Sequence, residues 1–295
     1  MKITIIGLAL AASAAFVQQP PQGPQPDVFL ASLDLSGGKV AVGTPVNVSN
    51  SAGYDNQPFF LADSSGLLFS SNRDASQNDI FRYDIGSKKV SQVTHTEENE
   101  YSPTVMAGGK TFSVVRGVEQ QLWQFDLDGN NARLAYAHTG KIGYHAWLSP
   151  TTIAVFVLGS GQGQPSTLEF VDTDSTKKPE VVEKSIGRSI LNRPGKGTVS
   201  YIATASRPYL IKEFDPKTKK TSTIVKTLGD QEFCAWLPDG GGLLTSQGAK
   251  LFVWRPGAAD WTEVADLSAA KLAGISRFAV SPDGRWLAIV ANPVQ

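Results

Sequence analysis

The sequence predicts an all-β protein, a six-bladed β-propeller with four-stranded antiparallel blades. Three observations lead to this prediction. Short apolar runs separated by turn residues recur at a spacing of about 40–50 residues, which is typical of propeller blades. An Asp closes the third run of most repeats. The last repeat stops after two runs, while two extra runs precede the first repeat.

The clearest repeat unit lies at residues 278–290. An apolar run enters a turn and a second apolar run leaves it, and the turn reads Ser281-Pro282-Asp283-Gly284. Pro presets φ at the first central position of a turn, Asp can bond its own backbone, and Gly accepts a positive φ. The pattern therefore predicts a β-hairpin.

The first complete repeat predicts four strands, at residues 56–61, 67–71, 79–84 and 89–94. Four short strands in about 45 residues match the size of one propeller blade. Similar repeats follow at residues 101–137, 144–182, 189–225 and 233–264.

The third strand of a repeat ends in an acidic residue at five places, and Arg255 takes that position in the fifth repeat. We expect each carboxylate to accept backbone N–H groups in the turn that follows. The five residues are Asp34, Asp84, Asp126, Asp172 and Asp215. Six third strands predict six blades.

The sixth repeat has two strands before the sequence ends at Gln295. The runs at residues 27–35 and 40–48 supply the two missing strands, so we expect the N-terminal strands to close the last blade. A generic β-sandwich would also explain short strands. It would not explain the recurring Asp or the divided last repeat.

The N-terminal residues 1–15 read as a secretory signal peptide, with Lys2, a short apolar core and a run of small residues. Cleavage is expected near Ala14 or Ala15, which predicts a periplasmic or secreted protein; a buried strand is the alternative reading. Residues 16–26 form a Pro- and Gln-rich linker, and residues 27–295 form the propeller. No other segment reads as a membrane span.

Composition narrows the function. Lys plus Arg and Asp plus Glu number 27 each, so nothing favours binding to nucleic acid. The sequence has one cysteine, Cys234, inside an apolar run, and we expect it in the core. The three histidines have no metal-ligand spacing, and no G-x-S-x-G motif is present. We therefore expect no catalytic residue, no metal ligand and no cofactor.

Two segments mimic ligand-binding loops. The glycine-rich residues 159–163 precede a strand instead of a helix, so they predict a hairpin loop and not a phosphate site. Residues 126–130 begin like a calcium loop, but they lack the later Gly and Glu of that motif and predict a turn.

The predicted binding site is one mouth of the central channel, where the first strand of each blade starts. Mixed charges and aromatic side chains there suit a peptide or a small polar ligand; a solvated rim is the alternative. The candidate residues are Asp55, Asn56, Glu100, Tyr101, Tyr144, His145, Arg188, Glu232, Phe233 and Arg277.

Several motifs resemble the repeat of the TolB-like, WD40-like propeller family. They are Trp147-Leu148-Ser149-Pro150, Trp236-Leu237-Pro238-Asp239-Gly240, residues 280–288 and residues 70–81. The resemblance implies a six-bladed propeller, often periplasmic, that acts as a binding platform. TolB carries an α/β domain before its propeller, and we expect none in this chain.

These inferences favour a non-catalytic binding or scaffolding platform for a protein, peptide or small polar ligand. We expect an envelope or secreted partner and a monomeric chain. The alternative is a propeller enzyme, a hydrolase resembling a lactonase or lyase, which would use channel carboxylates and a bound cation. Its candidate carboxylates are Asp55, Glu100 and Glu232.

Overall fold

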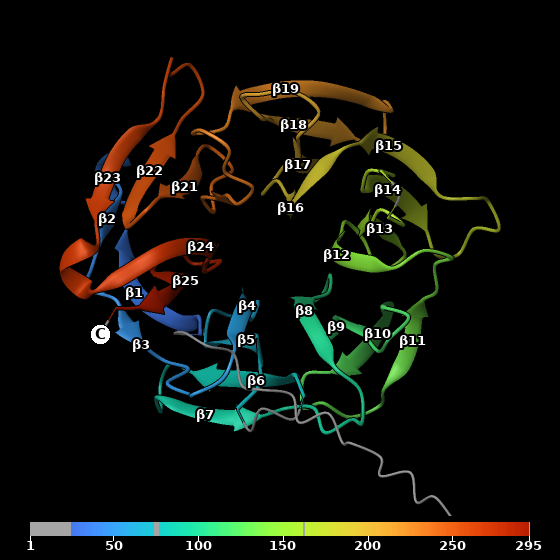
Figure 1. The fold of residues 1–295 in the computed structure, drawn as a ribbon, viewed down its shortest axis with the longest axis horizontal. Helices are drawn as coiled ribbons and strands as arrows, with labels where there is room; N and C mark the ends of the chain where they lie inside the picture. The colour runs from blue at the N-terminus through green and yellow to red at the C-terminus, as the bar shows by residue number, and fades with distance from the viewer. Residues whose placement is uncertain (1–24, 74–76, 162, 295) are drawn as a thin grey trace, which may run out of the picture.

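The computed structural model describes residues 25–73, 77–161 and 163–294. Six antiparallel sheets stand as blades around a central axis (Figure 1). This confirms the predicted all-β, six-bladed propeller. The predicted signal peptide, residues 1–15, and the linker up to residue 24 lie outside the described residues.

Blades one to five each contain four consecutive strands, and the first of them lies nearest the axis (Figure 1). Blade one contains β4 (Asp55–Phe60), β5 (Gly66–Ser71), β6 (Asp79–Asp84) and β7 (Lys89–Gln92). Blade two contains β8 (Glu100–Val105), β9 (Thr111–Arg116), β10 (Gln121–Asp126) and β11 (Arg133–Tyr136). Blade three contains β12 (Ile142–Trp147), β13 (Thr152–Val157), β14 (Thr167–Asp172) and β15 (Glu180–Lys184). Blade four contains β16 (Ile186–Asn192), β17 (Val199–Ala203), β18 (Leu210–Asp215) and β19 (Lys220–Lys226). Blade five contains β20 (Ala235–Trp236), β21 (Leu243–Gln247), β22 (Lys250–Trp254) and β23 (Thr262–Asp266).

Blade six joins the two ends of the propeller. Its inner strands are β24 (Leu272–Val280) and β25 (Trp286–Pro293), and its outer strands are β1 (Asp27–Asp34), β2 (Ala41–Val42) and β3 (Val46–Asn47). β1 pairs with β25 in an antiparallel register that runs from Asp27 opposite Ala291 to Ser32 opposite Trp286. The predicted closure by N-terminal strands is confirmed.

The outermost strand of blade six differs from the prediction. Residues 40–48 do not form one strand, because β2 and β3 pair with different parts of β1. Pro45 lies between them and has no N–H to donate to a ladder. The Gly43 N–H bonds Ser32 O at 2.9 Å, and a Cβ at Gly43 would lie 2.2 Å from Ser32 Oγ. The chain must bend closely past β1 there.

The apolar core is divided among the interfaces between blades. The six hydrophobic clusters of the described residues each join two neighbouring blades. At the closure, Val28 and Leu30 of blade six pack in one cluster with Leu67 and Phe69 of blade one. Because each blade buries both faces against its neighbours, the fold depends on a complete ring.

Serines on second strands add polar links between blades. Ser70 Oγ donates to Glu100 O of the next blade at 2.7 Å, and Ser246 Oγ donates to Ile275 O at 2.9 Å. In two other blades the serine accepts an indole N–H from the next blade. Trp147 Nε1 donates to Ser113 Oγ and Trp236 Nε1 donates to Ser200 Oγ, both at 2.8 Å. These bonds explain the Trp of the repeat motif.

Most of the recurring aspartates close turns as predicted. Asp34, Asp84, Asp172 and Asp215 each accept a backbone N–H two or three residues ahead. Asp126 is the exception, because its carboxylate accepts the side-chain amide of Asn131. Asp128 accepts the backbone N–H of that turn instead.

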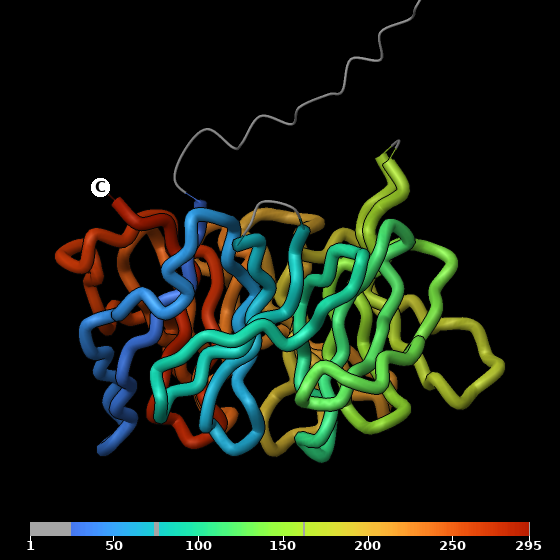
Figure 2. Tube along the Cα trace, turned by 90° about the horizontal axis from the view of Figure 1, so that it is seen from below, coloured from blue at the N-terminus to red at the C-terminus, as the bar shows by residue number. Residues whose placement is uncertain are grey.

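The remaining features agree with the sequence. Residues 159–161 and 163 belong to the hairpin loop between β13 and β14. Short 3₁₀ turns occur at η1 (Ser36–Gly38) and η2 (Ser268–Ala270). No helix among the described residues is long and apolar enough to cross a membrane. Both ends of the described chain reach the same face of the ring (Figure 2), which is the face where the first strands begin. We call it the start face.

Deletion of residues 27–48 should abolish the fold. The deletion exposes the edge of β25 and removes six buried apolar side chains, at Val28, Phe29, Leu30, Ala31, Leu33 and Val48. At about 1.5–3 kcal/mol per large apolar side chain, the loss is comparable to a whole-domain stability of about 5–15 kcal/mol. We expect an aggregated or molten product by circular dichroism and calorimetry.

A chain that begins at Gln25 keeps β1 and is the matched control. It should melt cooperatively, like the full chain. If the chain lacking residues 27–48 were soluble and melted cooperatively, β1 to β3 would be a dispensable tail and the closure would not carry the stability.

Candidate functional site

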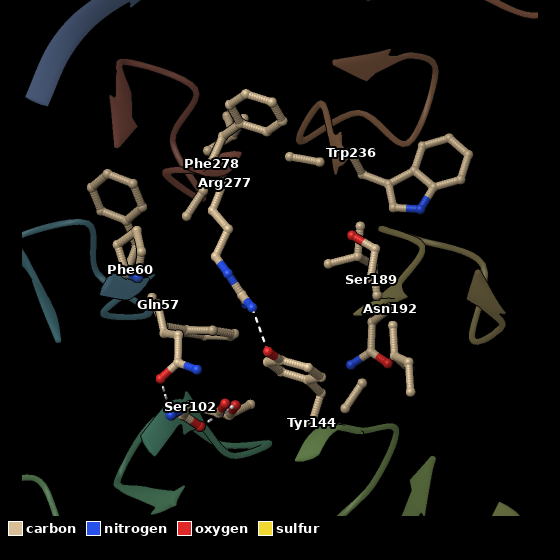
Figure 3. A pocket seen from close by; sticks show the side chains of 18 of the residues that line it. Gln57, Phe60, Ser102, Tyr144, Ser189, Asn192, Trp236, Arg277 and Phe278 are labelled. Carbon is tan, nitrogen blue, oxygen red and sulfur yellow. Dashed lines mark hydrogen bonds between the residues drawn. The ribbon is translucent and has the colours of Figure 1, made fainter. Parts of the chain in front are cut away.

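A cavity of about 460 Å³ occupies the central channel. The first strands of all six blades, and residues flanking them, line it, and most of the lining side chains are apolar. One lining residue from each of blades one to six is Gln57, Ser102, Tyr144, Ser189, Trp236 and Arg277, and Figure 3 labels all of them. The site is therefore assembled from segments far apart in sequence.

The structure divides the ten predicted site residues into two groups. Five line the cavity: Tyr144, His145, Arg188, Phe233 and Arg277. The others do not line it: Asp55, Asn56, Glu100, Tyr101 and Glu232. Each residue of the second group lies one or more positions earlier on its blade than the first lining residue, and so nearer the start face.

Arg277 dominates the electrostatics of the cavity. Its side chain extends from β24 in blade six toward β12 in blade three, and Nη2 donates to Tyr144 Oη at 2.5 Å (Figure 3). Its guanidinium carbon lies 4.6 Å from the centre of the Tyr144 ring and 4.4 Å from that of Phe233. Among the described residues, no carboxylate oxygen lies within 4.0 Å of this guanidinium. The charge is stabilised by aromatic faces instead of an acid.

Tyr54 belongs to the same electrostatic group, although the sequence did not single it out. Burial raises the pKa of its phenol to about 12, and the nearby charge of Arg277 opposes part of that rise. Tyr101, Tyr144 and Arg188 also interact with it electrostatically. The phenol of Tyr54 is thus influenced by the charges of two other phenols and two guanidinium groups.

Arg188 has a different setting from Arg277. Its side chain is 60% exposed, and its Nε lies 3.8 Å from Glu232 Oε2. Because this pair is solvated and balanced in charge, it contributes little net field to the cavity.

Gln57 and Ser102 are functional candidates that the sequence reasoning missed. Both have positive φ, 59° and 54°, and both lie at bulges in the first strands of blades one and two. The Ser102 N–H donates to Gln57 Oε1 at 2.8 Å across the interface between these blades (Figure 3). A signal existed, because Pro58 and Pro103 follow directly and Pro inside a strand indicates an edge or a bulge.

His145 is buried and joins two blades. Its Nε2 lies 2.6 Å from Ser113 Oγ, which also accepts the indole N–H of Trp147. Burial lowers the pKa of the imidazole to about 3, so the ring is neutral at pH 7. His145 touches the cavity wall as a neutral group, not as a free cation at the mouth.

Asp55 and Glu100 have no exposed surface, so neither is the open mouth residue that the sequence suggested. Asp55 accepts the Ser51 hydroxyl at 2.6 Å, and burial raises the pKa of its carboxyl group. Burial also raises the pKa of Glu100, to about 7, against opposing hydrogen bonds and the charge of Arg116. The Arg116 Nε lies 3.9 Å from Glu100 Oε1.

Few titratable groups line the cavity. Its lining contains no Asp or Glu, and no group of three or more His, Cys, Asp or Glu residues in the described parts of the chain could hold a metal ion. Cys234 lines the wall, but burial raises the pKa of its thiol to about 12, which keeps it protonated. What remains is an apolar chamber with one unpaired guanidinium.

Comparison with solved structures identifies a class of fold. TolB from Acinetobacter baumannii superposes with a TM-score of 0.57 at 13% identity, over 90% of this chain and 64% of that one. A TolB candidate from Agrobacterium tumefaciens gives 0.69 at 14% identity, over 92% of this chain and 100% of that one. An oligogalacturonate lyase in complex with manganese gives 0.57 at 13% identity, over 89% and 85%.

These likenesses show that the chain has a TolB-like six-bladed propeller fold, as the repeat motifs implied. The chain thus spans 64% of the length of the Acinetobacter protein. No protein-family model matches the sequence, and no curated protein matches it significantly.

The buried carboxyl of Glu100 should make stability depend on pH. Its pKa is about 7 in the folded protein and near 4.5 when unfolded, so the folded state binds the proton more tightly. Stability should therefore fall as pH rises from about 4.5 to 7, by at most about 3 kcal/mol. Glu100→Gln should flatten this part of the profile in urea titrations at pH 5 to 8.

Glu119→Gln is the matched control, since Glu119 is exposed in the turn between β9 and β10 of the same blade. It should keep the wild-type slope. An equal slope in wild type and Glu100→Gln would mean that Glu100 is ionised in the folded protein throughout this range.

Proposed function

We propose that this propeller is a non-catalytic binding module whose central cavity receives a small polar ligand or a segment of a peptide or protein. The observation that carries the proposal is the cavity walled by the first strands of all six blades, with the unpaired Arg277 inside it. The volume of about 460 Å³ is within the range of ligand-binding sites.

The setting of the cavity supports this function. Its walls are the first strands of the blades, and side chains of these strands pack against the neighbouring blades. This packing holds the walls in place, so the cavity exists before a ligand binds. Tyr144 and Phe233 offer aromatic surface, which is frequent at binding hot spots. The proposal includes export of the chain, with cleavage near Ala14 or Ala15 and a partner in the envelope or outside the cell.

We do not propose the cation-dependent enzyme that the sequence left as the alternative. Its candidate carboxylates, Asp55, Glu100 and Glu232, lie outside the cavity lining. The similarity to the lyase crystallised with manganese is a likeness of fold at 13% identity. No arrangement of acid and base in the described lining favours a reaction step.

The function is tested by capture from envelope extract on the immobilised mature protein, followed by calorimetric titration of what it retains. Tyr144→Ala combined with Phe233→Ala should weaken binding at least about 30-fold, the equivalent of the hot-spot threshold of about 2 kcal/mol. N-terminal sequencing of the protein recovered from the envelope checks the export.

Leu134→Ala combined with Val181→Ala is the matched control, since both side chains are about half exposed on outer strands. It should leave affinity unchanged. If this pair reduced binding and the cavity pair did not, the partner would dock on the outer edges of the blades and the proposal would be wrong.

Melting temperatures measured with and without a cation distinguish a binding module from a cation-dependent enzyme. A cation that binds only the folded state raises the melting temperature with concentration. Because the described lining offers no carboxylate, we expect no saturable shift with Mn²⁺ or Ca²⁺ at millimolar concentration. A saturable rise, abolished by a chelator, would favour the enzyme.

A further inference from the structure

We propose that the cavity is built for an organic monocarboxylate with an apolar body, and that the Arg277 guanidinium binds the carboxylate. The inference rests on the proposed function, since it names the chemical class of the ligand for the same cavity. Four properties of the described residues lead to it: the lack of an acid partner, the orientation of the guanidinium, the apolar walls and the net charge.

The charge of Arg277 has no carboxylate partner among the described residues. Seven other arginines lie within 4.0 Å of a carboxylate oxygen: Arg82, Arg116, Arg188, Arg193, Arg207, Arg255 and Arg285. Of the remaining described arginines, Arg133 is exposed, and the charge of Arg73 opposes the rise in pKa that burial causes at Asp55. Arg277 is partly buried, and no carboxylate oxygen of the described residues lies within 4.0 Å of its guanidinium. A partly buried guanidinium of this kind favours an anion from outside.

The orientation of the guanidinium is defined before any ligand arrives. Tyr144 and Phe233 come from two different blades, and the centre of each ring lies within 4.6 Å of the guanidinium carbon of Arg277. Within the described residues Arg277 makes one hydrogen bond, from Nη2 to Tyr144 Oη. The other N–H groups of its planar fork are free to donate to a carboxylate, which matches that fork with two parallel bonds.

The walls around Arg277 favour an apolar body on the ligand. Of the aromatic lining residues, Phe59 is exposed and Tyr144 and Phe233 are partly buried. The rings of Phe60, Trp236 and Phe278 are packed between blades and point away from the centre of the cavity (Figure 3). Arg188 is the other charged residue of the described lining, and the remaining polar side chains there are neutral. A ligand without an apolar part would leave these walls in contact with water.

The net charge favours a single negative charge. Arg188 is already paired with Glu232, so the cavity has one uncompensated positive charge among its described residues. Sites that bind phosphate usually use several cationic groups or a helix N-terminus. Neither feature occurs among the described lining residues, and a monocarboxylate matches the charge better.

The test compares carboxylates with amides of the same shape. The probes are 3-phenylpropionate against 3-phenylpropionamide, and the peptide Gly-Ala-Phe with a free C-terminus against the same peptide amidated. The full mature protein is titrated with each by calorimetry or by NMR line shifts. Each carboxylate should bind at least tenfold more tightly than its amide. A small organic acid and the C-terminus of a peptide present the same carboxylate. Whichever of 3-phenylpropionate and the free peptide binds more tightly identifies the kind of ligand that supplies it.

Variants assign the effect to Arg277. Arg277→Gln should reduce the affinity for each carboxylate at least tenfold and leave that for the amides unchanged. Arg277→Lys keeps the charge but loses the planar fork, so it should bind carboxylates with intermediate affinity. Arg133→Gln is the matched control, since Arg133 is exposed on β11, and it should bind like wild type. Melting temperatures confirm that each variant is folded.

Three results would overturn the inference. Equal affinity for acid and amide, or unchanged carboxylate binding in Arg277→Gln, would show that the guanidinium does not recognise the anion. Failure of all four probes at millimolar concentration would also reject this ligand class. Suppose that the four probes fail but the double variant Tyr144→Ala, Phe233→Ala still loses affinity for the captured partner. The proposed function as a binding module would then hold, and only the proposed ligand class would be wrong.

Discussion

The pairing of β1 with β25 is the constraint on which the rest of the structure depends. A blade of a propeller has no core of its own, because its apolar side chains pack against the two adjacent blades. Without the N-terminal strands, blade six would end at an open edge. The clusters on both of its sides would then be incomplete. Closure therefore links the two ends of the chain to the stability of every blade.

The same constraint creates the cavity. Six first strands converge on one axis only when the ring is complete, and their free edges then face one another across the channel. Several polar groups on these strands join blades, as in the hydrogen bond between Ser113 and His145 and the one that the Ser102 N–H donates to Gln57. Arg277 differs because it reaches across the axis to Tyr144 in blade three and makes no ion pair with the described residues. Seven of the other nine described arginines lie within 4.0 Å of a carboxylate oxygen, so a partly buried guanidinium without one is the reason to look for function there.

Much of this architecture was predictable from local patterns. Turn motifs, strand alternation and the position of the recurring aspartates identified the blades and their closure, because these features are encoded within a few consecutive residues. The site was predicted where the first strands start, and five of its ten candidate residues line the cavity, which extends past the ends of the first strands to Pro194, Pro238 and Pro282. Arg277, Tyr144 and Phe233 line the cavity, whereas Asp55 and Glu100 are buried outside its lining. The sequence shows where each first strand starts. It did not lead us to the bulges that decide which side chains enter the channel, although Pro58 and Pro103 lie at two of them.

The sequence by itself determined the class of fold, the number of blades and the strands that complete the ring, since periodicity and turn chemistry are local properties. The tertiary structure alone decided which side chains meet at the axis and which charges are paired there. Arg277 and Tyr144 are 133 positions apart, and Glu232 neutralises Arg188 across two blades. No spacing rule relates such residues, because their distance is set by the curvature of the ring and by the packing of every blade between them.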